Sequence, residues 1–288
     1  MELWAVGLIL LSALLHAVWN FLAKNSLDKY VFSWWMKLFE FLIYLPVGIY
    51  LLASSTISNV GWLIAIISGL VHTAYWILLS ASYTHGDLSI VYPISRSAPI
   101  TVTLLAVLFF GERLSLSGIA GILTVMLGVY ILSIDSLELK RLTHPFSSLR
   151  NLGVVLALLT ALSVTAYTLV DKSGADYFHP LLFVWTEKWI SIIPFTFLVT
   201  FSRRQRVPKE WRRNRWSIIA AGFLSPLSYA MIVFAMQSIQ VSYIVSIRQV
   251  SVVFGVILGG TILKEENIRI RLLSSILIFT GLFLIGVS

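Results

Sequence analysis

The chain has 288 residues, of which 58% are hydrophobic and only 12% are charged, and its mean hydropathy is +0.89. A soluble domain has about a quarter of its residues charged, and no soluble core could bury this much apolar surface. The net charge of +8 does not indicate nucleic-acid binding, because its largest basic cluster lies in one short segment between Arg203 and Arg215, and the lack of cysteine excludes disulfides.

Ten apolar runs follow one another along the chain, and each is close to the ~20 residues that a helix needs to cross ~30 Å of hydrocarbon. Barrel strands would be about ten residues long and would alternate in polarity, whereas these runs are longer and apolar on all sides. We therefore predict an all-α membrane protein of about ten transmembrane helices. The runs cover residues 3–23, 31–53, 60–83, 88–110, 114–134, 152–170, 181–201, 217–237, 241–263 and 269–287.

Prolines occur inside several of these runs and are interpreted as kinks and not as helix ends, because neighbouring helices and water can satisfy the freed backbone groups. The first run follows no basic segment, so it is interpreted as a spanning helix and not as a cleaved signal. Glycine spacings predict close helix packing. The prolines are Pro46, Pro93, Pro99, Pro194 and Pro226, and the glycines are Gly118, Gly121, Gly128, Gly255 and Gly259.

The connections between runs differ strongly in basic residues. The odd-numbered connections hold 15 Lys and Arg, seven of them between Arg203 and Arg215, whereas the even-numbered ones hold only Arg113 and Lys172. Positively charged connections stay in the cytoplasm. The count predicts that the loop 202–216 is cytoplasmic and that both termini lie outside.

The chain also repeats itself weakly, with an offset of 148 residues between Ala13 and Ala161 that grows to 153 between Glu112 and Glu265. We predict a first five-helix repeat over residues 1–136, a second over 150–288 and a connecting loop over 137–149. Because five is odd, the two copies must cross the bilayer in opposite senses. An inverted repeat of this kind predicts a central cavity between the halves.

Three segments carry a resemblance to a known family: HAVWNFLAK in the first run, PISRSAPITVTLLAVLFFGERLS at the end of the fourth, and SIRQVSVVFGVILGGTILKEE at the end of the ninth. With the ten helices in two halves, they resemble the EamA-like branch of the drug/metabolite transporter superfamily. The resemblance implies a secondary transporter of small metabolites with a central cavity, but no particular substrate. The second copy of the Gly-Glu-Arg signature, at Lys264, departs from it by losing the glycine. Many members are thought to keep their termini in the cytoplasm; we follow the charge count.

Ionisable residues inside the runs are few, and such residues usually face the interior of a helix bundle because exposure to lipid costs ~2.5–3.5 kcal/mol each on insertion scales. The repeat pairs the second run with the seventh and the fourth with the ninth. Paired charges of this kind predict a site between the halves. The residues are Lys37, Glu40, Arg96, Glu187, Lys188 and Arg248, with His16 and His72 in addition.

Arg96 is the strongest candidate for substrate binding because it lies between Pro93 and Pro99, where backbone donors are lost. Tyr92 precedes it by one turn and can share its face. Arg248 is its counterpart in the second half. The alternative for both arginines is that they reach the headgroups along their own aliphatic stems.

The remaining charged candidates lie in the second and seventh runs. Lys37 and Glu40 are three residues apart and can form an ion pair on one helix face. A fixed ion pair that only stabilises the helix is at least as well supported by this spacing as a role in transport. Glu187 and Lys188 are adjacent and diverge by about 100° around the helix, so they are not expected to satisfy each other. Lys37 and Lys188 are candidate substrate ligands, and Glu40 and Glu187 are candidate proton-coupling groups because burial favours the neutral form of a carboxyl.

Aromatic and amide residues at mid-depth complete the candidate site. Trp19, Asn20 and Trp76 are suited to a cavity wall, where ring faces and a few hydrogen-bonding groups hold a solute. His16 and His72 are equally compatible with structural hydrogen bonds and with proton transfer. Tryptophans near the run ends are typical of interface anchors.

The sequence therefore predicts a secondary transporter of a small polar metabolite, anionic or zwitterionic, that works by alternating access. A membrane-embedded enzyme acting on a lipid or isoprenoid substrate is the alternative, but no cluster of His, Asp and Glu has the spacing of a catalytic or metal site. A channel or structural subunit has no need of an inverted repeat. No cofactor, metal or nucleic acid is expected; the partners are the lipid bilayer and the transported metabolite, and a prokaryotic inner (plasma) membrane is favoured. The oligomeric state is left open.

Overall fold

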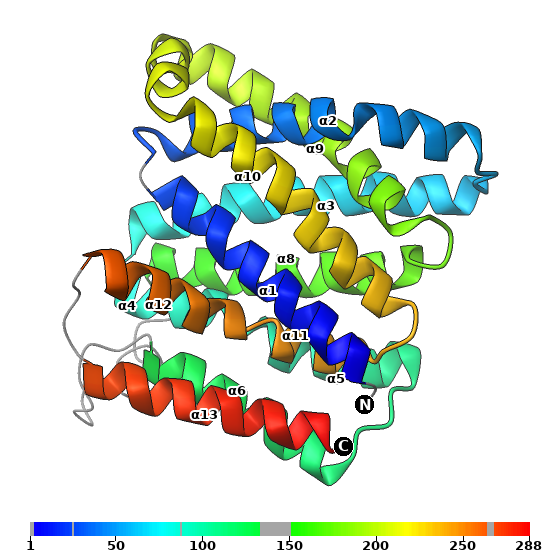
Figure 1. Ribbon diagram of the computed structural model, residues 1–288, viewed down its shortest axis with the longest axis vertical. Helices are drawn as coiled ribbons and strands as arrows, with labels where there is room; N and C mark the ends of the chain where they lie inside the picture. The colour runs from blue at the N-terminus through cyan, green and yellow to red at the C-terminus, as the bar shows by residue number, and fades with distance from the viewer. Residues whose placement is uncertain (1–2, 25, 87, 133–150, 264–267) are drawn as a thin grey trace.

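The computed structural model describes residues 3–24, 26–86, 88–132, 151–263 and 268–288, and within these ranges it contains helices and no strand (Figure 1). The first half consists of α1 (Leu3–Lys24), α2 (Lys29–Ala53), α3 (Asn59–His85), α4 (Leu88–Ser95), α5 (Ala98–Phe110) and α6 (Leu116–Leu132). The second half consists of α8 (Leu152–Gly174), α9 (Pro180–Ser202), the 3-10 helix η1 (Arg204–Arg206), α10 (Val207–Met236), α11 (Val241–Ile247), α12 (Val250–Leu263) and α13 (Ile268–Gly286).

The described helices confirm the predicted all-α membrane class. Six of them, α1, α2, α3, α8, α9 and the segment of η1 with α10, are long and apolar enough to cross a membrane, and shorter apolar helices make up the other spans. Pro46, Pro194 and Pro226 lie inside helices, as predicted. The predicted connecting loop, residues 137–149, lies outside the described residues.

Two predicted spans are each broken into two helices. The fourth is interrupted between α4 and α5 and the ninth between α11 and α12. Pro99 stands in the first turn of α5, where a missing N–H costs nothing; its interpretation as a kink is wrong, because its ring would clash with a continuing helix. The ninth span has no proline at its break, and its backbone tightens there into i to i−3 hydrogen bonds from Gln249 to Ser246 and from Ser251 to Arg248.

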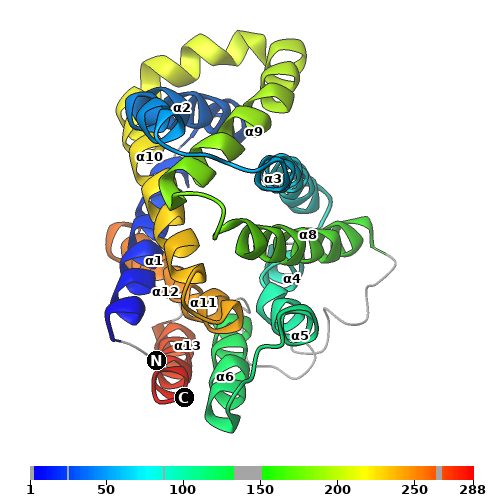
Figure 2. The ribbon, with the colours of Figure 1, turned by 90° about the vertical axis from the view of Figure 1, so that its right-hand side faces the viewer.

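The two halves interlock through equivalent helices. α1 packs against α10 and α3 packs against α8, which is the same contact made once from each half, while α2 packs against α9 and α6 against α13. The connections α1–α2 and α9–α10 lie at one end of the bundle, which we call the basic face. The connections α2–α3, α8–α9 and α10–α11 lie at the other end, together with the start of α1 and the end of α13 (Figures 1 and 2). We call this end the terminal face.

Glycine allows α6 and α13 to approach each other at backbone distance. A Cβ atom on Gly121 would lie 2.7 Å from the carbonyl oxygen of Gly281, and one on Gly128 would lie 2.9 Å from that of Ser274. Gly255 by contrast has open space around it and lines a cavity. The predicted packing role is therefore wrong for Gly255, which faces the hollow between the halves and no neighbouring helix.

The basic segment predicted as the loop 202–216 is helical, because η1 and the first turns of α10 extend the chain beyond α9. Asp28 ties it to the first half. The Asp28 carboxylate caps the start of α2 and accepts hydrogen bonds from Arg203 at 2.6 Å and Arg206 at 2.7 Å. The backbone N–H of Asp28 donates to Glu210 at 2.9 Å. This cluster fixes the α1–α2 connection to the α9–α10 connection.

The cluster predicts a dependence of stability on pH. Burial raises the pKa of Asp28, but the hydrogen bonds from Arg203, Arg206 and the Val31 N–H, together with the charge of Arg203, lower it by more in sum, so the pKa lies below the ordinary value of 3.8. A carboxyl with a lowered pKa stabilises the fold above its unfolded-state pKa and loses that contribution as the pH falls through its folded-state pKa. We expect Asp28→Asn to lower the melting temperature at neutral pH and the difference from wild type to shrink below pH 3.8.

Thermal unfolding in detergent across this pH range measures the effect. The matched control is Asp176→Asn, which changes an exposed aspartate in the α8–α9 connection and is expected to melt like wild type at every pH. An Asp28→Asn protein that is as stable as wild type at neutral pH would contradict the account of the cluster.

Candidate functional site

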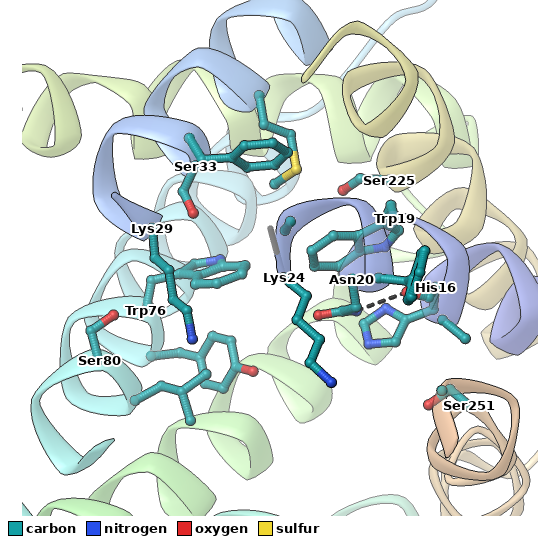
Figure 3. Close-up of a pocket in the computed structure, with 18 of the residues that line it drawn as sticks. His16, Trp19, Asn20, Lys24, Lys29, Ser33, Trp76, Ser80, Ser225 and Ser251 are labelled. Carbon is teal, nitrogen blue, oxygen red and sulfur yellow. Dashed lines mark hydrogen bonds between the residues drawn. The ribbon is translucent and has the colours of Figure 1, made fainter. Parts of the chain in front are cut away.

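A cavity of about 530 Å³ lies between the two halves and reaches the basic face (Figure 3). Lys24, Lys29 and Tyr30, next to the α1–α2 connection, line its mouth, and Lys188 and Tyr229 line its deeper part. Tyr92 on α4 and Ser251 on α12 lie on its wall, so the hollow separates these two half-helices. The described structure is therefore open on the side of the basic residues.

The two helix breaks place Arg96 and Arg248 on the cavity wall. The Arg96 guanidinium lies 5.4 Å from the ring centroid of Tyr92, as the one-turn spacing predicted, and that of Arg248 lies 5.1 Å from the ring of Tyr229. Arg248 also lies 3.4 Å from His16. Among the described residues neither arginine forms an ion pair with a carboxylate. A second hollow of about 80 Å³ adjoins both arginines, so each has space for a partner from solution.

Aromatic side chains from α1 and α3 form one side of the cavity. The ring centroids of Trp19 and Trp76 lie 6.3 Å apart. The ring of His16 is nearly perpendicular to that of Trp19, with the two ring centroids 4.9 Å apart. Asn20 donates a hydrogen bond to the carbonyl oxygen of His16 at 2.8 Å and points into the hollow (Figure 3). Apolar ring faces with a few polar groups are typical of a small-molecule site.

The acids and lysines of α2 and α9 are arranged differently from the sequence prediction. Lys188 lies 2.5 Å from Glu187 and 3.7 Å from Glu40, whereas Lys37 donates to Ser191 at 3.2 Å. The predicted Lys37–Glu40 pair is therefore replaced by a pair that joins the two halves. The expectation that Glu187 and Lys188 cannot meet is wrong, because these long side chains bend toward each other although their Cα–Cβ bonds diverge.

Seven of the eight predicted substrate ligands line the cavity: Trp19, Asn20, Trp76, Tyr92, Arg96, Lys188 and Arg248. Lys37 does not belong to the described lining, and its side chain is 1% exposed. The predicted proton-coupling residues, Glu40 and Glu187, are each 1% exposed and lie around Lys188, behind the wall.

Asp171 is the buried acid that sequence reasoning missed. It lies on α8 and accepts hydrogen bonds from Ser68 at 2.5 Å, from Tyr229, and from His72, whose Nε2 is 3.0 Å away. The predicted run ends at residue 170 and assigns Lys172 to a connection, whereas α8 continues to Gly174 and includes Asp171. The repeat contained the missing signal, since the matching segment of α1 continues as a helix to Lys24.

The terminal face is closed where the halves meet. The Glu112 carboxylate accepts hydrogen bonds from the backbone N–H of Val241 at 2.5 Å and from the Ser242 hydroxyl at 2.5 Å, at the first turn of α11. The Gln240 side chain donates to the carbonyl oxygen of Arg113 at 3.1 Å, and α11 packs against α5 and α6. Glu265, the counterpart of Glu112 in the repeat, lies outside the described residues.

Comparison with known proteins gives the family. Residues 3–134 and 151–287 each match the EamA-like transporter family, so the chain belongs to this family of membrane transporters, which are not enzymes. A crystal structure of another protein aligns over 98% of this chain and 95% of that chain with a TM-score of 0.76 at 14% identity, which shows a shared fold. A search of curated proteins gives no match. The family rules out the membrane-enzyme alternative, and the protein is a multi-pass membrane protein.

The lysine bridge between the halves gives a second prediction. In Lys188→Met, Glu40 and Glu187 lose their shared cation, and removal of one partner from a buried ion pair costs about 3–5 kcal/mol. We therefore expect a clear fall in melting temperature in detergent. Lys188→Met combined with Glu187→Gln should regain part of the loss, because one uncompensated charge is removed.

The control for this experiment is Lys209→Met, which changes an exposed lysine in the first turn of α10 and should leave the melting temperature unchanged. A double variant that is less stable than Lys188→Met would contradict the assignment of Lys188 as the charge partner of Glu187.

Proposed function

We propose that this transporter carries a small anionic or zwitterionic metabolite by alternating access, with Arg96 and Arg248 as the principal ligands. One observation carries the proposal. The described lining of the cavity contains five lysine and arginine side chains and no aspartate or glutamate. Such a surface attracts negative groups and repels cations. The five cations are Lys24, Lys29, Arg96, Lys188 and Arg248.

The charged residues inside the spans are mostly basic. Lys37, Arg96, Lys188 and Arg248 against Glu40 and Glu187 give a net charge of +2, and Asp171 lowers this sum to +1 when His72 is neutral. Asp171 is fully buried and held by Ser68, His72 and Tyr229, so its charge lies behind the wall. Because Asp171 does not line the cavity, the lysine and arginine side chains of the lining still attract an anion.

The geometry supports a small solute. Pockets of about 300–1,000 Å³ hold small molecules, and this cavity has about 530 Å³. Two guanidinium groups can each bind one carboxylate or phosphorus oxyanion through paired hydrogen bonds. The ring faces of Trp19 and Trp76 suit the ammonium group of a zwitterion. Amino acids, carboxylates and phosphorus oxyanions are therefore the substrate classes.

Alternating access is supported by the difference between the two faces. The hollow reaches the basic face, whereas α11 is held against α5 and α6 at the terminal face. In an inverted repeat, exchange of the conformations of the two halves turns the opening to the other side. With the basic residues in the cytoplasm, the described state is open to the cytoplasm of a prokaryotic cell.

Exchange in proteoliposomes tests the function. Vesicles loaded with unlabelled aspartate, malate or 2-aminoethylphosphonate are diluted into the same labelled solute, and we expect saturable counterflow of at least one. Charge-assisted hydrogen bonds are worth about 1.5–3 kcal/mol, so Arg96→Gln and Arg248→Gln should each reduce exchange by roughly 10- to 100-fold.

Arg213→Gln, at an exposed position on α10, is the control and should exchange like wild type. Wild-type rates in both cavity variants, at equal amounts of inserted protein, would contradict the assignment of the arginines. Non-saturable flux in the wild type would indicate a channel and contradict the carrier.

A further inference from the structure

A histidine and an aspartate from opposite halves meet beside the cavity. His72 on α3 lines the hollow, and its Nε2 lies 3.0 Å from the carboxylate of Asp171 on α8. Asp171 is fully buried and His72 is 7% exposed. Histidine changes its charge within the physiological pH range, so this pair can bind and release a proton where one partner touches the aqueous cavity.

The pair is positioned by contacts from α3, α8 and α10. Ser68, one turn before His72, donates to Asp171 at 2.5 Å, and Tyr229 on α10 donates to the same carboxylate. The imidazole is stacked on Tyr167 of α8, with the ring centroids 4.0 Å apart. These contacts hold the carboxylate in one orientation and leave the second imidazole nitrogen as the group that can exchange a proton with the cavity.

Other ionisable groups face this pair. Tyr75 lies on the same helix as His72, and its ring meets Tyr167. Glu187 and Lys188 on α9 interact electrostatically with His72 and Asp171, respectively, and these two residues pair with each other. Arg248 lies 5.1 Å from the ring of Tyr229, whose hydroxyl binds Asp171. A single tyrosine therefore connects the pair with a proposed substrate ligand.

We propose that the His72–Asp171 pair is the proton-binding site that couples transport to a proton gradient. The proposal rests on the proposed function and replaces Glu40 and Glu187 as the candidates, because both of those acids already pair with Lys188 and lie away from the cavity lining. One proton enters the pair from the cavity and resides on the imidazole. The pair changes from a neutral imidazole with a carboxylate, of charge −1, to an imidazolium with a carboxylate, of charge 0.

The charge change supplies the coupling. α3 and α8 come from different halves, and an uncompensated charge buried between them is costly, whereas a neutral hydrogen-bonded pair is much less so. Proton binding stabilises the closed packing of α3 on α8 beside the pair. Proton loss weakens this packing. It also leaves the charge of the Asp171 carboxylate unbalanced, and Tyr229, which donates to that carboxylate, lies next to Arg248. The proton thereby acts on the contact between α3 and α8 directly, and a substrate bound at Arg248 acts on the same contact through Tyr229.

The first test needs no substrate. Protein labelled with ¹⁵N-histidine is reconstituted in lipid, and the signal of His72 is identified by its loss in His72→Gln. We expect this signal to change from that of a neutral imidazole to that of an imidazolium when the vesicles are acidified, and this response to differ in Asp171→Asn, because the partner carboxylate is missing. A signal that does not respond to acidification, or a response that Asp171→Asn leaves identical, would overturn the proposal.

The second test separates coupling from transport. Wild-type vesicles with an imposed pH difference should concentrate the solute that shows counterflow, whereas Asp171→Asn should retain measurable counterflow and lose at least 10-fold in accumulation. Asp176→Asn, the exposed control, should accumulate like wild type. Accumulation by Asp171→Asn at the wild-type level, or by wild type without a pH difference, would overturn the coupling role and leave the carrier intact.

The two failures are distinguishable. Absence of counterflow in the wild type for every solute tested contradicts the proposed function, and the His72 titration then decides on the proton site by itself. A melting curve of Asp171→Asn within a few degrees of wild type shows that a loss of accumulation reflects the missing carboxylate and not an unfolded protein.

Discussion

The cost of placing a guanidinium group in hydrocarbon governs this structure. Arg96 and Arg248 lie inside the fourth and ninth apolar runs, and each must meet water or an anion, because isolated charges are expensive in the bilayer core. The chain meets this requirement by breaking the helix at each arginine, between α4 and α5 and between α11 and α12. Both guanidinium groups thereby face one cavity, whose described lining has no acidic residue.

The same inverted repeat explains why the two ends of the bundle differ. At the terminal face, α11 is capped by Glu112 and packs against α5 and α6. At the basic face, the corresponding half-helix α4 and the half-helix α12 contribute separate parts of the cavity wall. Two halves with related sequences thus differ in how their half-helices pack at the two ends of the bundle. The His72–Asp171 contact lies between α3 and α8, so a change in the packing of the two halves would alter this contact.

Much of this arrangement follows from residue patterns. Length and hydropathy predict the spans, and the repeat predicts that Arg96 and Arg248 are equivalent. The sequence analysis does not predict the two helix breaks. At the fourth span, Pro99 is interpreted as a kink although it starts a new helix. At the ninth span, the break consists of changed backbone hydrogen bonds next to Arg248, which composition does not indicate. Charge partners were also missed: helix periodicity describes the direction of Cβ atoms, whereas Lys188 reaches its partners through a long flexible chain, and the partner of Asp171 comes from another helix.

Thiol labelling tests the central claim most directly, because the chain has no cysteine of its own. Single cysteines replace Ser33 and Ser251 on the cavity wall, Gln205 on the basic face and Thr56 on the terminal face. In inside-out vesicles, a membrane-impermeant methanethiosulfonate should modify the first three and spare the fourth. Modification of Gln205→Cys without either cavity cysteine, or modification of the cavity cysteines only from the side of Thr56→Cys, would contradict a wet cavity open at the basic face.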